Sequence, residues 1–192
     1  MPHETVQIRT DDGVCPAYVH HPEGDGPWPA VLVFHDGMGV RPALNEIAER
    51  IASAGYYALL PDLFYRIGGF RADPATLFSD PVQRADFMSR VAPSASAPNV
   101  MRDMAAFLAH LDADPHVRAG PVGITGYCMG GRLSFVAAGT FGDRVAASAA
   151  YHPSNLATDA ADSPHLLAPR ITARVYVGAA MEDRGFDEAQ QA

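Results

Sequence analysis

The feature that most constrains this chain is a series of short apolar runs separated by segments of helical spacing. The run PAVLVF at 29–34 and the run at 56–60 have the composition of strands buried on both faces of a sheet. Three further strands are expected at 122–125, 145–151 and 171–177. Strands that alternate with helices predict a mostly parallel sheet with helices on both faces, which is an α/β fold.

The segments between these strands complete the expected domain. Helices are predicted at 44–54, 100–112 and 130–140, and a further helix begins at 187. Residues 4–9 and 14–20, around a turn at 11–13, predict a β-hairpin. Residues 64–98 have poor periodicity, so we expect a partly helical excursion over one end of the sheet, and 153–168 are expected to form a loop. Because no repeat or linker divides the chain, we predict a single domain over 1–192.

Charge and composition exclude several classes of function. The formal net charge of −8 argues against nucleic acid and anionic membranes as partners, since both require a basic surface. The chain has no lysine, which excludes a Walker-type phosphate loop and a lysine Schiff base. Cys15 and Cys128 lack metal-ligand spacing, and no cofactor is implied. Without an apolar run of about 20 residues or a hydrophobic signal core, we expect a soluble, cytoplasmic protein.

The clearest chemical signal is Gly126-Tyr127-Cys128-Met129-Gly130-Gly131, placed between a predicted strand and a predicted helix. It fits the pattern glycine, any residue, nucleophile, any residue, glycine, in which the nucleophile occupies a strained turn that leaves its neighbours no room for a β-carbon. The turn places Cys128 at a helix N-terminus, where the partial positive charge favours a thiolate. The backbone N–H of Met129 is the expected first donor to an oxyanion.

At these residues the sequence resembles the dienelactone hydrolases, a family of α/β-hydrolases whose nucleophile is a cysteine in this strand–turn–helix motif. We call the turn at 126–131 the elbow. The segments VLVFHDGMGV at 31–40 and ALLPDLFYR at 58–66 resemble the same family. The resemblance implies an α/β-hydrolase fold that cleaves carboxylic esters or lactones. It implies Asp36 as a supporting acid beside the nucleophile, where the family usually has glutamate, and the Gly37 N–H as the second oxyanion donor. It also implies Asp183 as the acid of a Cys/Asp/His triad, with Glu182 as the fallback.

The family's histidine lies one strand beyond the acid, but all eight histidines of this sequence precede Asp183. We therefore expect a chain that lacks its last strand and helix, with its catalytic histidine beyond residue 192. In that case 171–177 forms an unpaired edge strand. The alternative is a substitute base, for which His35 and His152 are the candidates because both follow apolar strands.

The expected substrate is a small ester or lactone, and an arginine of the excursion would bind its carboxylate. Arg84 is our choice among the excursion's arginines, with His35 and His152 as further candidate contacts. Two other functions stay open. One is a redox-sensing thiol, and the other is an inactive fragment that only binds small molecules.

Overall fold

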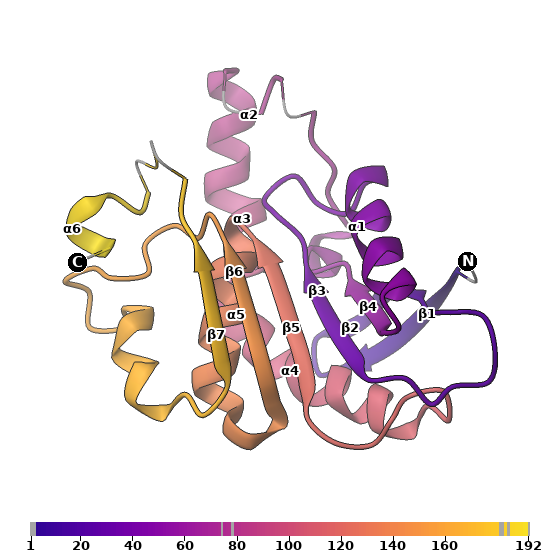
Figure 1. Ribbon diagram of the computed structural model, residues 1–192. Coiled ribbons are helices and arrows are strands. Elements are labelled where there is room, and N and C mark those ends of the chain that lie inside the picture. Colours follow the sequence, from indigo (N-terminus) through magenta and orange to yellow (C-terminus); the bar gives the residue numbers. More distant parts are fainter. Residues whose placement is uncertain (1–2, 74, 78, 181–182, 184, 192) are drawn as a thin grey trace.

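The computed structural model describes residues 3–73, 75–77, 79–180, 183 and 185–191 (Figure 1). In this part of the chain one sheet has the order β1-β2-β4-β3-β5-β6-β7. Its strands are β1 (His3–Thr10), β2 (Gly13–His20), β3 (Ala30–Phe34), β4 (Tyr57–Pro61), β5 (Val122–Tyr127), β6 (Val145–Tyr151) and β7 (Arg174–Gly178). The hairpin β1–β2 is antiparallel and joins β4 antiparallel, whereas β4, β3, β5, β6 and β7 are mutually parallel. The predicted α/β architecture is confirmed.

The helices cover the two faces of the sheet unequally. They are α1 (Pro42–Ser53), α2 (Pro81–Asp86), α3 (Ala92–Ser94), α4 (Ala97–Ala113), α5 (Met129–Phe141) and α6 (Glu188–Gln191). Helix α1 packs on one face, while α4 and α5 lie behind the sheet on the other (Figure 1). None of the helices in the described ranges is both long enough and apolar enough to cross a bilayer.

The predicted excursion is a chain of short helical turns. It contains a 3₁₀ turn at Tyr65–Ile67, then α2, a π-helical turn at Phe87–Val91, and α3. Two predictions near the C-terminal end were wrong in detail. The strand expected from 171 begins at Arg174, and a 3₁₀ helix at Pro164–Arg170 replaces part of the expected loop. Pro164 occupies the start of that helix, where its fixed φ suits the first turn.

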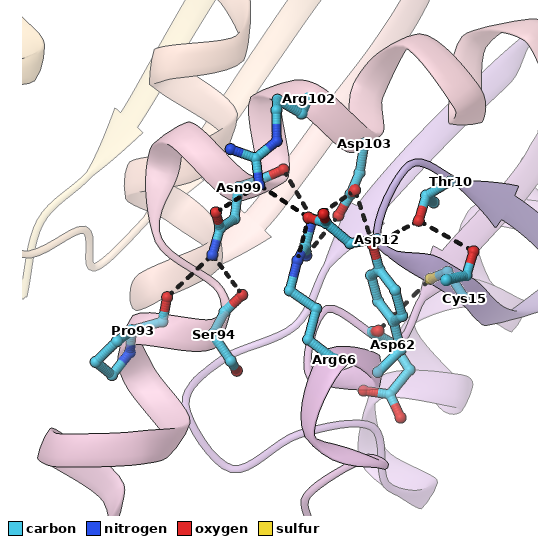
Figure 2. Close-up of polar contacts among 12 residues, drawn as sticks. Thr10, Asp12, Cys15, Asp62, Arg66, Pro93, Ser94, Asn99, Arg102 and Asp103 are labelled. Carbon is cyan, nitrogen blue, oxygen red and sulfur yellow. Dashed lines mark hydrogen bonds and ion pairs between the residues drawn. The ribbon is translucent and has the colours of Figure 1, made fainter.

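An ion-pair cluster, buried at Asp103 and exposed at Arg102, fastens the excursion to the N-terminal hairpin and α4 (Figure 2). The Arg66 guanidinium donates to both carboxylate oxygens of Asp103, at 2.7 and 2.8 Å, and its Nε donates to Asp12 at 2.8 Å. The Tyr65 hydroxyl donates to Asp103 at 2.9 Å, and Arg102 donates to Asp12 at 2.8 Å. Because these residues come from the β1–β2 turn, the excursion and α4, the cluster fixes three separate segments relative to one another.

The sheet face beside α1 is open at its β7 side. A groove of about 770 Å³ runs there between α1 and strands β5, β6 and β7. Four tyrosines line it, and three of them are in contact, with Tyr127 stacked on Tyr151 at 5.3 Å between ring centroids and Tyr176 tilted against Tyr151 at 5.6 Å. Tyr176 is 58 % exposed. Strand β7 pairs with β6 on one side and forms the edge of the described sheet, as the sequence predicted.

Candidate active site

Cys128 occupies a strained turn between β5 and α5. Its φ of 53° and ψ of −114° lie outside the regions that a residue with a β-carbon normally adopts. A β-carbon on Gly126 would collide with the backbone of Gly130, and one on Gly130 would collide with the backbone at the end of β3. The Cys128 N–H donates to the Tyr151 carbonyl at 2.9 Å, which holds the turn against β6. The strand, tight turn and helix predicted around GYCMGG are confirmed.

The Cys128 thiol is half-buried between hydrogen-bond donors and two carboxylates. The Met129 N–H and the Ser154 hydroxyl act to lower the pKa of this thiol, and the carboxylates of Asp36 and Asp183 act to raise it. Burial raises the pKa of the thiol, and the two carboxylates raise it further, although the two donors oppose this shift. Burial thus opposes the thiolate that the helix N-terminus is expected to favour.

Asp36 follows β3 and is 6 % exposed. Arg41 donates to both of its carboxylate oxygens at 2.7 Å, and the Met38 N–H donates to it at 2.9 Å. The Asp36 carboxylate acts to raise the pKa of the Cys128 thiol, and both of its oxygens are engaged by a bidentate ion pair with Arg41. Sequence reasoning missed Arg41, because only the fold of the turn at 36–39 brings the guanidinium back onto the carboxylate.

Gly37 lies beneath the aromatic ring of Phe87. A β-carbon at Gly37 would be 2.9 Å from Phe87 Cζ, so only glycine fits there without displacing the ring. The Gly37 N–H donates to none of the described residues, which leaves it available as a donor. Phe87 comes from the π-helical turn of the excursion, so the excursion covers this side of the site.

Asp183 is half-buried in the loop after β7. Its Oδ1 accepts from the Gly185 N–H at 2.9 Å, and the Gly185 carbonyl accepts from the Asn155 N–H at 2.6 Å. These contacts join the acid loop to the loop that follows β6. The fallback acid Glu182 lies outside the described residues.

The two candidate substitute bases differ in their surroundings. His35 is fully buried, its Nδ1–H donates to the Asp36 carbonyl at 2.7 Å, and its Nε2 accepts from the Leu63 N–H at 3.0 Å. Both ring nitrogens are therefore occupied, and burial lowers the pKa of His35. His35 is thus unsuited to be a base or a substrate contact in this structure.

His152 is exposed at the carboxyl end of β6 and has a φ of 38°. Its backbone N–H donates to the Gly178 carbonyl at 2.7 Å. Among the described residues its ring forms no hydrogen bond, ion pair or ring stack. His152 therefore lies at the expected edge of the sheet, without a contact that would orient it toward the thiol.

The excursion's arginines do not converge on the elbow. Arg66 and Arg90 are paired with carboxylates, and Arg71 donates to a tyrosine hydroxyl. Arg84 is exposed on α2, where it lines a surface pocket of about 400 Å³ with Ser79, Pro81, Ala85 and Met88. None of those lining residues belongs to the elbow, so the role of Arg84 in substrate binding remains a prediction.

The arrangement agrees with what is known of similar proteins. The model of the dienelactone hydrolase family matches residues 15–192. A Methylorubrum extorquens protein, provisionally named a carboxymethylenebutenolidase, is 35 % identical over 167 residues, which are 82 % of this chain and 55 % of that protein. This chain therefore spans about half the length of that curated relative.

Solved structures give the same result. A provisionally named dienelactone hydrolase from Klebsiella pneumoniae aligns with a TM-score of 0.72 and 27 % identity, over 92 % of this chain and 71 % of that one. A dienelactone hydrolase-like promiscuous phosphotriesterase from metagenomic libraries aligns with a TM-score of 0.71 and 26 % identity, over 100 % of this chain and 74 % of that one. The family model covers most of the chain and the fold is the same, and so this chain belongs to the dienelactone hydrolase family.

Proposed function

We propose that Cys128 is the nucleophile of a hydrolase that cleaves carboxylic ester or lactone bonds. The observation that carries the proposal is the strained turn at Cys128, which presents the thiol between the Met129 N–H and two carboxylates at the carboxyl ends of the parallel strands. Sheet enzymes of this architecture bind ligands at that edge. Asp183 is the proposed acid of the triad and Asp36 a supporting acid.

In the proposed reaction the thiol gives its proton to a base, and its sulfur attacks the carbonyl carbon. The oxygen of the tetrahedral intermediate accepts from the N–H groups of Met129 and Gly37. The carbon–oxygen bond then breaks, the alcohol or the ring oxygen leaves with a proton, and a thioester on Cys128 remains. Water hydrolyses the thioester and regenerates the thiol.

The proposed base is a histidine that follows the acid, as the family resemblance implies. None of the eight histidines in the sequence follows Asp183, and neither His35 nor His152 contacts the thiol among the described residues. For the 192-residue chain alone we therefore expect slow acylation of Cys128 and little or no turnover. A carboxylate-bearing ester or lactone is the proposed substrate class, with Arg84 as a candidate contact.

The surroundings of the thiol support a hydrolase over a redox-sensing thiol. A sensor cysteine needs neither an oxyanion donor nor a triad acid, whereas Gly37 after β3 and Asp183 after β7 would supply both at the edge of the sheet that carries Cys128. A catalytically inactive binding fragment is the remaining alternative, and the following assay separates it from the proposal.

The test uses p-nitrophenyl acetate, with the burst and the steady-state turnover recorded separately. We expect a slow burst of up to one equivalent that persists in Cys15→Ala, which keeps Cys128 as its single cysteine, and disappears in Cys128→Ala. A burst that survives in Cys128→Ala, or no burst in the parent chain, would overturn the proposal. Turnover lost specifically in His152→Ala would instead identify His152 as a resident base.

A further inference from the structure

Two histidines face each other across the open end of the β1–β2 hairpin. His3 begins β1, His20 ends β2, and the two residues are direct partners in the antiparallel register. Direct partners project their side chains to the same face of the sheet, and the two imidazole ring centres are 5.1 Å apart. The His3 side chain is exposed, whereas His20 is 1 % exposed. The pair therefore joins an accessible ring to a buried one.

A hydrogen bond to Asn45 of α1 fixes the tautomer of the buried ring. The Asn45 amide nitrogen donates to the Arg41 carbonyl at 3.4 Å, and its oxygen Oδ1 lies 3.0 Å from His20 Nε2. An amide oxygen only accepts hydrogen bonds, so Nε2 carries the proton and donates it to this oxygen. Nδ1 is then the nitrogen with the free lone pair. It is buried and has no hydrogen-bond partner among the described residues.

This state of His20 is the one that binds metal ions. A histidine ligand is a neutral imidazole, held in place by a hydrogen bond at the nitrogen that does not bind the metal. Burial lowers the pKa of His20, so the ring is neutral at pH 7. The His3 ring forms no hydrogen bond or ion pair with a described residue, so its nitrogens are free to turn toward an ion.

The geometry of the two rings suits a shared ion. A zinc–nitrogen bond is about 2.0–2.1 Å long, so two imidazoles that bind one tetrahedral ion have ring centres about 5 Å apart. The ring centres of His3 and His20 have this separation. An imidazole lone pair lies in the plane of its ring, and the planes of these two rings are tilted by 42°, so they intersect.

We propose that His3 and His20 bind one Zn²⁺ ion, through Nδ1 of His20 and a ring nitrogen of His3, with Asn45 as the residue that orients His20. No group of three or more His, Cys, Asp or Glu side chains in the described ranges could hold a metal, so water completes the four ligands. The ion joins β1 to β2 at the end opposite their turn. Because His20 pairs with Ala58 near the start of β4, the site lies at the amino ends of the parallel strands, away from the elbow.

Isothermal titration calorimetry with Zn²⁺ tests the proposal, in the Cys128→Ala background so that this thiol does not compete for the ion. We expect one equivalent of Zn²⁺ to bind, and His3→Ala, which removes an exposed side chain, to weaken binding at least about tenfold. His116→Ala is the matched control. His116 is also exposed and lies 5.8 Å from the His21 ring centre, but these two rings are stacked within 9° of parallel and cannot direct lone pairs at one ion. The affinity of this control should equal that of the parent.

Two substitutions of Asn45 test the bound nitrogen. Loss of an outer-shell partner costs about 10–100-fold in metal affinity, so Asn45→Ala should weaken Zn²⁺ binding about tenfold. Asn45→Asp gives Nε2–H a carboxylate acceptor, which makes Nδ1 more basic and should tighten binding. Zn²⁺ should also raise the Tm of the parent and not that of His3→Ala, with circular dichroism used to confirm the fold of each variant. The absence of saturable binding, or equal affinities in the parent and His3→Ala, would overturn the proposal.

Discussion

Removing Arg66 should destabilise the chain far more than removing a similar arginine from the surface. Arg66 is 11 % exposed and supplies two of the three hydrogen bonds recorded to the Asp103 carboxylate, which is 2 % exposed. Arg66→Met keeps much of the apolar stem but leaves the buried carboxylate with Tyr65 as its recorded donor. Breaking a buried ion pair by removing one partner costs about 3–5 kcal/mol, because a charge is left without compensation.

The remaining contacts favour the lower end of that range. The Tyr65 hydroxyl still donates to Asp103, and Arg102 still pairs with Asp12. We therefore expect Arg66→Met to reduce the free energy of unfolding by about 3 kcal/mol. For a domain of this size that corresponds to a fall in Tm of roughly 6–12 °C.

Urea unfolding followed by circular dichroism measures this cost, with Arg90→Met as the matched control. Arg90 makes the same two-pronged contact with Asp86, but both side chains are exposed, so the midpoint should not change measurably. Adding Asp103→Asn to Arg66→Met should recover part of the loss, because the buried charge is gone. Equal midpoints for Arg66→Met and Arg90→Met, or no recovery in the double variant, would show that the loss of Arg66 does not leave a costly unpaired charge on Asp103.

Two further predictions concern the residues that support the elbow. Burial holds the pKa of His35 below its usual 6.5, so the unfolded chain binds a proton at this residue before the folded chain does. The neutral His35 ring therefore contributes fully to the free energy of unfolding above about pH 6.5, and this contribution is lost as the pH falls below that value. His35→Gln should reduce the loss of unfolding free energy between pH 7 and pH 5. Part of the pH dependence should remain, because burial also lowers the pKa of His20. An unchanged pH dependence in His35→Gln would contradict the prediction that His35 is buried in its neutral form. Gly130→Ala should prevent the native elbow from forming, seen as a large fall in Tm, because its β-carbon would meet the backbone of β3. Gly123→Ala in β5, which meets mainly a valine methyl, should be tolerated, and equal losses in the two variants would refute the steric account.

The sheet and the elbow could be predicted from the sequence because their signals are local. Continuous apolar runs give buried strands, and Gly126 avoids a clash with the backbone of Gly130, only four residues further along the chain. Strand β7 was predicted to begin too early because Ile171 is apolar. In the structure Ile171 packs against the core from the end of a 3₁₀ helix, so its burial does not mark a strand.

The contacts around the thiol could not be predicted in the same way. Arg41 reaches Asp36 through a turn, and Phe87 covers Gly37 from a distant helical turn. The direction of the pKa shift of the Cys128 thiol could not be predicted from the sequence either. Its sign is the balance of desolvation, donors and carboxylates that meet only in the folded chain.

The open face of the sheet has a consequence for the thermodynamics of unfolding. Tyr176 and its neighbours on β7 already meet water in the folded chain, so unfolding exposes less new apolar surface than it would in a domain whose sheet is covered on both faces. Newly exposed apolar surface sets the heat-capacity increment, which for 192 residues is normally about 2.3–2.9 kcal/mol/K. We expect a smaller increment here. The chain should then have a flatter stability curve and a lower urea m-value than its length suggests.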